Sequence, residues 1–294
     1  MGKKINKDGD CESYCVCSEA VTLNFLGYEL VRDVLPGEIL YITKQGELIS
    51  NIADITNAVS VKKPCMFEWV YFSGAESVIA KKSIYATRLN LGKVLASEIK
   101  RDHSLDVDIV VPVPDTSRTA AISLAEELDL PYREALIKNR YTQRSFILSG
   151  QENREKAVEL KLSPVISEIR GKKILLVDDS VVRGTTSKKI INLLKKYGAK
   201  SVSLAITCPP LRSPCYYGID FPSANQLVAN QKTIPEIEEY LDANKVYYLS
   251  EDGLQEAIGL SSLCMACVNG KYPTSIEEGK RFALKREEQR INNE

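Results

Sequence analysis

The pattern of hydrophobic and polar residues divides the chain into three sections, the first of which ends at about residue 72. Short apolar runs alternate there with turn residues. Val21–Leu30 is apolar, Leu35–Glu38 is typical of a turn, and Ile39–Ile42 is a β-type run that meets a Gln-Gly pair. This pattern predicts a piece made of hairpins without a helix of its own, with Trp69 in the core of a strand.

Residues 73–223 alternate between helical and strand patterns. Apolar residues at helical spacing cover Ser83–Lys100 and Thr119–Leu128, and a further helix ends at Tyr197. Three continuous apolar runs are typical of strands buried on both faces of a parallel sheet: Asp108–Val113, Ile174–Val177 and Ser201–Thr207. Strands and helices in alternation predict an α/β fold with a parallel sheet and right-handed crossovers.

Residues 224–294 form a third section, which is mostly helical. Helices are expected at Ile234–Leu241, Leu254–Ile258 and Ser275–Arg290. The last of them carries so many charges that we expect a solvated surface helix. The predicted domains are therefore residues 1–72, 73–223 and 224–294.

Composition and charge exclude several classes of protein. The chain has 294 residues with 39 basic and 39 acidic side chains, so its net charge is zero. A dedicated nucleic-acid binder usually has a basic excess. No apolar run reaches the roughly 18 residues that a membrane span needs, and the first ten residues contain no apolar signal core. We therefore expect a globular protein of the cytoplasm that binds neither nucleic acid nor membrane.

Cysteine usage indicates a possible metal or redox pair. Without a secretory signal, the eight thiols are expected to stay reduced. Cys208 is interpreted as a small buried apolar residue. The Cys-x-x-Cys spacing of Cys264 and Cys267 brings two thiolates to one centre, either a metal or a redox disulfide.

The segment Ile174–Ser187 contains the strongest chemical signal. A buried strand ends in Asp178 and Asp179, and a turn rich in Gly, Thr and Ser, Arg183–Ser187, then opens a helix. Ligands of open α/β sheets bind at the carboxyl ends of the strands. Backbone amides at a helix N-terminus favour a phosphate dianion, and two adjacent carboxylates favour polyol hydroxyls or hydrated Mg²⁺. A simple helix N-cap explains one Asp and one Ser or Thr but not this whole arrangement.

This segment resembles the phosphoribosyl-diphosphate (PRPP) motif of type I phosphoribosyltransferases. The segments around it, Val113–Ser117, Lys138–Tyr141, Arg144–Ile147 and Tyr217–Asp220, resemble the glutamine PRPP amidotransferase family, also called the amidophosphoribosyltransferases. The resemblance runs from about Glu12 to about Thr274. It implies a type I phosphoribosyltransferase fold and transfer of an amino group to C1 of PRPP. The products would be pyrophosphate and 5-phosphoribosylamine, in the first step of purine synthesis.

The resemblance also implies roles for individual residues. Thr116, Asp178 and Asp179 would be the Mg²⁺-associated positions. The expected PRPP-binding set is Asp115, Thr116, Ser117, Asp178, Asp179, Ser180, Arg183, Gly184, Thr185, Thr186 and Ser187. The aspartate pair would act in catalysis with three basic residues of segment 138–161, which closes over PRPP in the family: Lys138, Arg140 and Arg144.

Two positions in this basic segment depart from the family pattern. The family usually has proline where this chain has Ser149, and a basic residue where it has Glu159. Serine would change the stiffness of the segment. A carboxylate near a pyrophosphate site would weaken PRPP handling.

The resemblance assigns four of the cysteines to a cluster. One branch of the family binds a [4Fe–4S] cluster through four cysteines, whose matches here are Cys65, Cys215, Cys264 and Cys267. Zn²⁺ in a Cys₄ site is the alternative, because sequence does not separate the two. A structural or oxygen-sensing role is expected, without redox chemistry in the transfer. The remaining cysteines near the N-terminus, Cys11, Cys15 and Cys17, match no ligand position.

The nitrogen donor stays open. Glu12–Ile42 resembles the end of the Ntn-type glutaminase domain that precedes the transferase in the family, so the first section is expected to be a β-rich remnant of it. Ammonia would come from a separate glutaminase subunit or from solution, or else the chain is an inactive fragment. The resemblance also implies a homo-oligomer and feedback by purine nucleotides. The alternative function is a non-catalytic PRPP- or nucleotide-binding regulator on the same fold.

Overall fold

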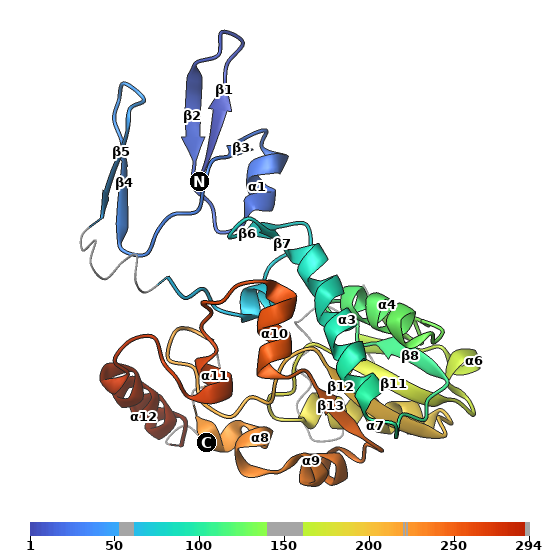
Figure 1. Cartoon of the computed structure of the whole chain (residues 1–294). Coiled ribbons are helices and arrows are strands. Elements are labelled where there is room, and N and C mark those ends of the chain that lie inside the picture. The colour runs from blue at the N-terminus through green and yellow to red at the C-terminus, as the bar shows by residue number, and fades with distance from the viewer. Residues whose placement is uncertain (53–61, 140–160, 220, 222, 292–294) are drawn as a thin grey trace. The chain divides into compact units, whose positions relative to one another are not determined.

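A computed structural model describes residues 1–52, 62–139, 161–219, 221 and 223–291 (Figure 1). The chain divides into two compact units. The first unit comprises Met1–Thr87 with Leu260–Cys264, and the second unit comprises Arg88–Gly259 with Met265–Glu294. These units do not test the predicted division into residues 1–72, 73–223 and 224–294, which stays a prediction.

The second unit is built around a parallel sheet. Its strands follow the order β13 (Val246–Tyr248), β12 (Ser201–Ile206), β11 (Lys173–Asp178) and β8 (Ile109–Pro112), and each neighbouring pair is parallel. In the central strand, Ile174 lies between Ile109 and Val202. Nearly every residue of β8, β11 and β12 is buried, as expected for strands covered on both faces. The predicted α/β fold with a parallel sheet is confirmed.

Helices connect and cover these strands. The long ones are α3 (Ile84–Arg101), α4 (Arg118–Leu128), α7 (Thr185–Lys196), α9 (Ile234–Leu241), α10 (Glu251–Ile258) and α12 (Glu277–Ile291). The short ones are α6 (Ile166–Ile169), the 3₁₀ turn η2 (Ala224–Gln226), α8 (Val228–Gln231) and α11 (Ala266–Asn269). Helix α4 packs on β8, α7 on β12 and α9 on β13. The predicted helices are confirmed with ends shifted by a few residues.

The helix starts follow local capping chemistry. A capping box joins Thr233 and Glu236 at the start of α9. Ser250 Oγ accepts a hydrogen bond from the Gly253 N–H at the start of α10 (2.9 Å). Strand β13 lies in the section predicted as mostly helical, and its three residues are too few to show a periodicity.

A two-stranded antiparallel ribbon of the second unit flanks residues 140–160. It pairs β9 (Leu136–Lys138) with β10 (Leu162–Pro164), so that Lys138 lies opposite Leu162. The ribbon fixes the position of Lys138, one of the predicted site residues.

The first unit consists of small antiparallel sheets. One has the order β2 (Cys11–Cys15), β1 (Gly2–Ile5) and β3 (Glu29–Leu30). The others are hairpins of β4 (Glu38–Ile42) with β5 (Leu48–Ile52) and of β6 (Val78–Ile79) with β7 (Lys82–Ser83). The predicted hairpin at Ile39–Ile42 is confirmed.

Two expectations for the first unit are wrong. The apolar run Val21–Leu30 contains a helix, α1 (Ala20–Phe25), where no helix was predicted. Only Leu23 of this helix is buried, so the run lacks the repeated apolar face that identifies a helix in sequence. Trp69 is fully buried as expected, but in a π-helical turn, Glu68–Phe72, and not in a strand.

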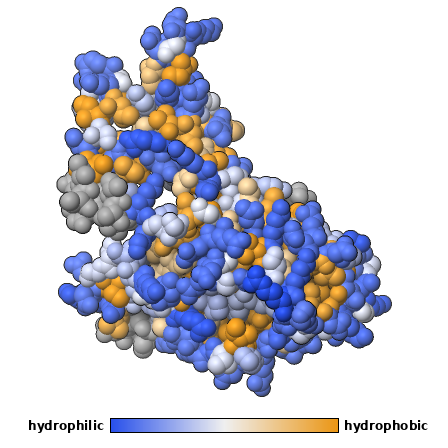
Figure 2. All heavy atoms as spheres, in the orientation of Figure 1, coloured by the Kyte–Doolittle hydropathy of each residue, from blue (hydrophilic) through white to orange (hydrophobic). Residues whose placement is uncertain are grey.

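Apolar side chains remain at the surface of the first unit, as Figure 2 shows. Phe25 of α1 is 88% exposed, and Ile39 and Tyr41 of β4 are 61% and 62% exposed. A two-stranded hairpin has too few neighbours to bury both of its faces. Within the described part of the chain, no helix has the length and apolar character needed to cross a membrane.

Candidate functional site

The carboxyl ends of two neighbouring parallel strands bring the predicted site residues together in the second unit. The loop after β8 carries Thr116 and Ser117, and the end of β11 carries Asp178 and Asp179. The Val113 N–H donates to the Val177 carbonyl (2.8 Å), which extends the pairing of the strands up to the site. This edge is where ligands of open α/β sheets bind.

Hydrogen bonds hold both carboxylates in place. Thr116 Oγ1 donates to Asp179 Oδ2, and Ser180 Oγ donates to Asp179 Oδ1 (2.8 Å). Asp178 Oδ1 accepts from the Asp179 backbone N–H (2.9 Å) and from Ser117 Oγ (3.3 Å). Five of the predicted PRPP-binding residues thus form one hydrogen-bonded group.

The two carboxylates lie in an environment that opposes their negative charge. Asp178 is 9% exposed and Asp179 is 7% exposed. Burial, followed by the charge of Asp179, raises the pKa of Asp178 well above its usual value. Burial also raises the pKa of Asp179, while hydrogen bonds from Thr116 and Ser180 act in the opposite direction. A ligand that brings a cation or hydroxyl donors would compensate this charge.

Arg88 is a charged residue near the pair that sequence reasoning missed. It lies on α3, is 4% exposed, and its charge lowers the pKa of Asp179. A signal for it exists in the sequence. Arg88 follows Ile84 by four residues and precedes Leu91 by three, so it stands on the apolar face of the helix. A buried charge at such a position requires a partner.

The turn between β11 and α7 carries the residues that the sequence predicts to bind the 5-phosphate. Gly184 precedes the first residue of α7 with φ of +75°, a conformation that favours glycine. The first N–H groups of a helix have no partner within it, and α7 has no acidic residue in its first turn to occupy them. Thr185 and Thr186 are exposed, whereas Ser187 is buried. The Arg183 guanidinium donates to Gln226 Oε1.

The structure pairs Asp115 with two cations. Lys138 Nζ lies 2.6 Å from Asp115 Oδ2, and Arg118 lies 3.2 Å from Asp115 Oδ1. The ion pair with Asp115 places Lys138 next to the loop that carries Thr116. The peptide bond between Pro114 and Asp115 in this loop is cis. The other predicted basic residues, Arg140 and Arg144, lie outside the described residues, as do Ser149 and Glu159.

Two of the four predicted cluster cysteines lie in the first unit. Cys65 and Cys264 face each other in an isolated parallel β-bridge. The Cys264 N–H donates to the Pro64 carbonyl (2.9 Å), and the Met66 N–H donates to the Cys264 carbonyl (3.2 Å). Two segments about 200 residues apart in sequence are thereby joined.

The other two cluster cysteines lie in the second unit, beside one tyrosine. Burial raises the pKa of Tyr272, and the neighbouring Tyr216, Cys215 and Cys267 add to the effect. The Tyr217 N–H donates to Cys215 Sγ (3.4 Å). Within the described ranges, no group of three or more His, Cys, Asp or Glu side chains is close enough together to hold a metal ion.

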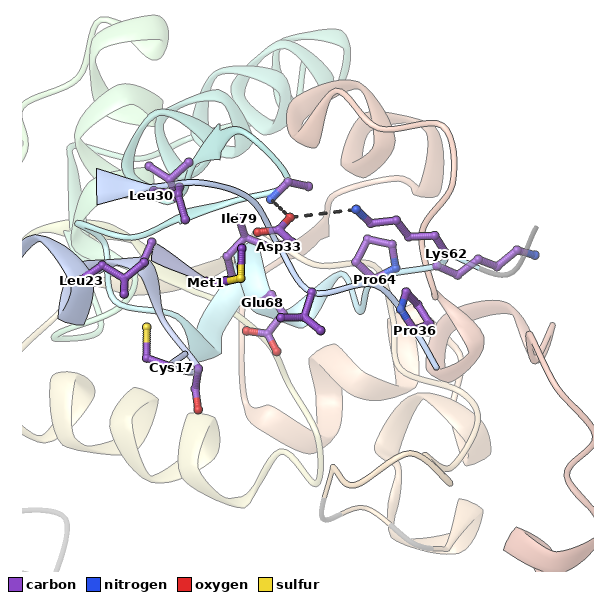
Figure 3. A pocket seen from close by; sticks show the side chains of 16 residues that line it. Met1, Cys17, Leu23, Leu30, Asp33, Pro36, Lys62, Pro64, Glu68 and Ile79 are labelled. Carbon is purple, nitrogen blue, oxygen red and sulfur yellow. Dashed lines mark hydrogen bonds and ion pairs between the residues drawn. The ribbon is translucent and has the colours of Figure 1, made fainter. Parts of the chain in front are cut away.

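The first unit contains a cavity of about 440 Å³ (Figure 3). Apolar side chains such as Leu23, Leu30 and Ile79 line it together with Asp33 and Lys62. Asp33 Oδ2 accepts from the Ala80 N–H (3.2 Å) and lies 4.0 Å from Lys62 Nζ. None of the lining residues is a predicted site residue.

Comparison with known proteins identifies the class first. Residues 82–220 match the family model of the phosphoribosyl transferase domain. With the parallel sheet and the acidic pair at its edge, this match shows that the chain carries a type I phosphoribosyltransferase domain.

The curated relatives to which the chain is similar are amidophosphoribosyltransferases. The chain is 48% identical over 273 residues to the amidophosphoribosyltransferase of Methanocaldococcus jannaschii, with 89% of this chain and 57% of the relative covered. It is 44% identical over 287 residues to that of Escherichia coli, with 95% of this chain and 56% of the relative covered. Over about nine-tenths of its length the chain is thus similar to amidophosphoribosyltransferases, and it spans about half the length of the curated relatives it matches.

A solved structure supports the same assignment. The glutamine PRPP amidotransferase of B. subtilis, in complex with ADP and GMP, superimposes with a TM-score of 0.80 at 39% sequence identity. The comparison covers 89% of this chain and 57% of that chain. The predicted fold is therefore confirmed, and so is the predicted resemblance to amidophosphoribosyltransferases.

Proposed function

We propose that this chain transfers an amino group to C1 of PRPP. The bond from C1 to the pyrophosphate oxygen breaks, a bond from C1 to the ammonia nitrogen forms, and a proton leaves the nitrogen. The products are 5-phosphoribosylamine and pyrophosphate. The observation that carries the proposal is the hydrogen-bonded group of Asp178 and Asp179 with the loop after β8, beside a helix start without an acidic first turn.

Each part of PRPP has a matching feature of the chain. Asp178 and Asp179 would accept hydrogen bonds from the ribose hydroxyls. The backbone of Arg183–Ser187 at the start of α7 would bind the 5-phosphate, because a helix N-terminus favours an anion. Lys138 would exchange its contact with Asp115 for the pyrophosphate oxygens, together with Arg140 and Arg144.

The residues at the site fit Mg²⁺. Two carboxylates whose pKa values are raised by burial need a compensating cation, and Mg²⁺ is usually held by one or two carboxylates plus substrate phosphates. Thr116, Asp178 and Asp179 would hold the ion. When bound, it would neutralise the charge that develops on the pyrophosphate.

The test is a pyrophosphate-release assay with PRPP, Mg²⁺ and ammonium chloride. Asp178→Asn combined with Asp179→Asn should lower kcat/KM by about 10²–10³-fold or more, since the pair touches the substrate. Asp129→Asn is the matched control, because Asp129 is exposed and its left-handed backbone suits asparagine. Equal activity in the double variant and the wild type would contradict the proposal.

The same assay separates the possible nitrogen donors. We propose that ammonia is the direct donor, free or supplied by a glutaminase. Glutamine in place of ammonium should then give pyrophosphate release only when a glutaminase is active in the assay. PRPP binding without release under both conditions would favour the alternative function, a non-catalytic regulator that binds PRPP or nucleotides.

We also propose that Cys65, Cys215, Cys264 and Cys267 bind a [4Fe–4S] cluster, with Zn²⁺ as the alternative. The β-bridge of Cys65 with Cys264 and the shared neighbour of Cys215 and Cys267 support it. Protein purified without oxygen should contain iron with acid-labile sulfide, or else zinc, and Cys215→Ser should lose it. A homo-oligomer, feedback by purine nucleotides and a cytoplasmic location stay predictions.

A further inference from the structure

Tyr240 lies directly against the phosphate-binding loop. A Cβ atom on Gly184 would come within 2.9 Å of Tyr240 Cε1 and within 3.0 Å of Leu241 Cδ2. The first distance is shorter than real Cβ contacts and the second is tighter than most of them, so the tyrosine ring occupies the space beside the loop backbone. The close approach of α9 and the positive φ of Gly184 both require glycine at this point.

The segment that ends in α9 contacts the two preceding loop residues as well. The Val228 N–H donates to the Val182 carbonyl (2.9 Å), and Gln226 Oε1 accepts from the Arg183 guanidinium. Three consecutive loop residues are therefore each held by residues 224–241. Because loop and segment belong to the second unit, these contacts form one continuous support behind the loop.

The Tyr240 ring also lies beside two lysines. Lys188 Nζ is 4.8 Å from the ring centroid and Lys232 Nζ is 5.8 Å from it. Both distances are within the range of a cation–π contact. Lys188 belongs to the beginning of α7, next to the N–H groups that would bind a phosphate. The ring thus orients a cation at the same place where it supports the loop.

We propose that Tyr240 is a positioning residue for the 5-phosphate of the substrate. Its ring holds Gly184 and the start of α7 in the conformation that binds the phosphate, and it directs Lys188 along that helix start. This inference rests on the proposed function, because the phosphate is that of PRPP. It adds a residue of α9, which lies outside the motif in sequence and which no loop pattern contains.

The experiment compares Tyr240→Ala and Tyr240→Phe in the full chain. Phenylalanine keeps the ring, so KM for PRPP should stay within about twofold of the wild type. Alanine should raise KM for PRPP about tenfold with a smaller change in kcat, because a looser loop weakens binding more than chemistry. Binding of ribose 5-phosphate, measured by calorimetry, should weaken by a similar factor, whereas binding of pyrophosphate should not change.

Tyr197→Ala is the matched control. Tyr197 also lies beside a lysine, with Lys196 Nζ 5.8 Å from its ring centroid. It stands at the C-terminal end of α7, whereas the phosphate-binding loop is at the N-terminal end. This variant should bind ribose 5-phosphate like the wild type. Gln226→Ala provides a second test, since it removes the contact to Arg183 without changing α9, and a several-fold loss of ribose 5-phosphate binding is expected.

The outcomes separate this inference from the proposed function. If the wild type binds ribose 5-phosphate and Tyr240→Ala binds it equally well, the positioning role is wrong and the proposed function stands. An equal loss in Tyr240→Phe and Tyr240→Ala would also overturn it, because the ring would not be the cause. If the wild type binds neither ribose 5-phosphate nor PRPP, the proposed function fails and the inference fails with it.

Discussion

The two units of the chain differ in how they bury apolar residues. In the second unit, β8, β11 and β12 are buried along almost their whole length, and helices cover the sheet. In the first unit, β4 and β5 expose several large apolar side chains: Ile39, Tyr41, Ile42 and Ile49. Most of the large apolar residues exposed in the described part of the chain belong to the first unit.

This difference indicates where rigidity is available. A site needs side chains held by packing and by hydrogen bonds from more than one element. The second unit supplies this at the edge of its sheet, and every described residue proposed to bind PRPP lies there. The exposed apolar surface of the first unit is of the kind that marks an interaction site.

The largest expected effect is a loss of stability when a buried isoleucine is replaced. One isoleucine from a strand of each unit provides a matched pair. Ile174 of β11 is fully buried, whereas Ile39 of β4 is 61% exposed. Ile174→Ala should lower the free energy of unfolding by about 2–5 kcal/mol, because it removes buried methyl groups and leaves a cavity. Ile39→Ala should change it by less than about 0.5 kcal/mol. Urea unfolding of the full chain measures both.

The same two variants can also show that the two units do not differ in burial. A destabilisation by Ile39→Ala as large as that by Ile174→Ala would mean that the face of β4 is covered in solution. The dependence of the Ile39→Ala effect on protein concentration would then show whether a second copy covers it.

A smaller effect of opposite sign is expected at the site itself. The pKa of Asp178 in the folded chain is raised above its usual value near 3.8, so ionisation of this group destabilises the fold as the pH rises above that value. Asp178→Asn should therefore increase the free energy of unfolding at pH 7 without Mg²⁺. Below pH 3 the difference should disappear. Asp129→Asn serves again as the exposed control, and no gain at pH 7 would contradict the prediction.

The smallest effect concerns an ion pair of the first unit. The Arg32 guanidinium bonded to Glu38 lowers the pKa of that carboxyl from 4.5 to about 2, with further hydrogen bonds from the Leu35 N–H and Ser50. A lowered carboxyl pKa contributes stability above about pH 4.5 and loses it as the pH falls toward 2. The contribution should be about 1 kcal/mol, because solvent screens the partly exposed Arg32.

Hydrogen exchange of peptides that cover β4 and β5 tests this ion pair. At pH 6, Glu38→Gln should increase exchange relative to the wild type. Near pH 2 the two proteins should exchange alike. A constant ratio between them across this range would show that the ion pair adds nothing to the stability of the hairpin.

The sequence determined the features that depend on neighbouring residues. Helical and strand periodicity located α3, α4, α7, β8, β11 and β12, because apolar spacing reports which faces are buried. The order of Asp178, Asp179 and the turn before α7 was sufficient to predict a candidate site, since a strand end and a helix start lie within a dozen residues. The resemblance to the family needed the surrounding segments as well. Short elements were not predicted, among them α1 with six residues and β13 with three, because so few residues show no periodicity.

Tertiary structure alone decided which contacts distant residues make at that site. Arg88 acts on Asp179 from α3, Lys138 pairs with Asp115, and Tyr240 lies against Gly184 from α9. Local patterns marked Lys138 and the apolar-face position of Arg88, but no local pattern contains these contacts, because each is made by the packing of a helix or ribbon on the sheet. Local spacing specifies which elements form and where they end. The charges and rings that surround the site depend on how those elements pack, and that is a property of the whole fold.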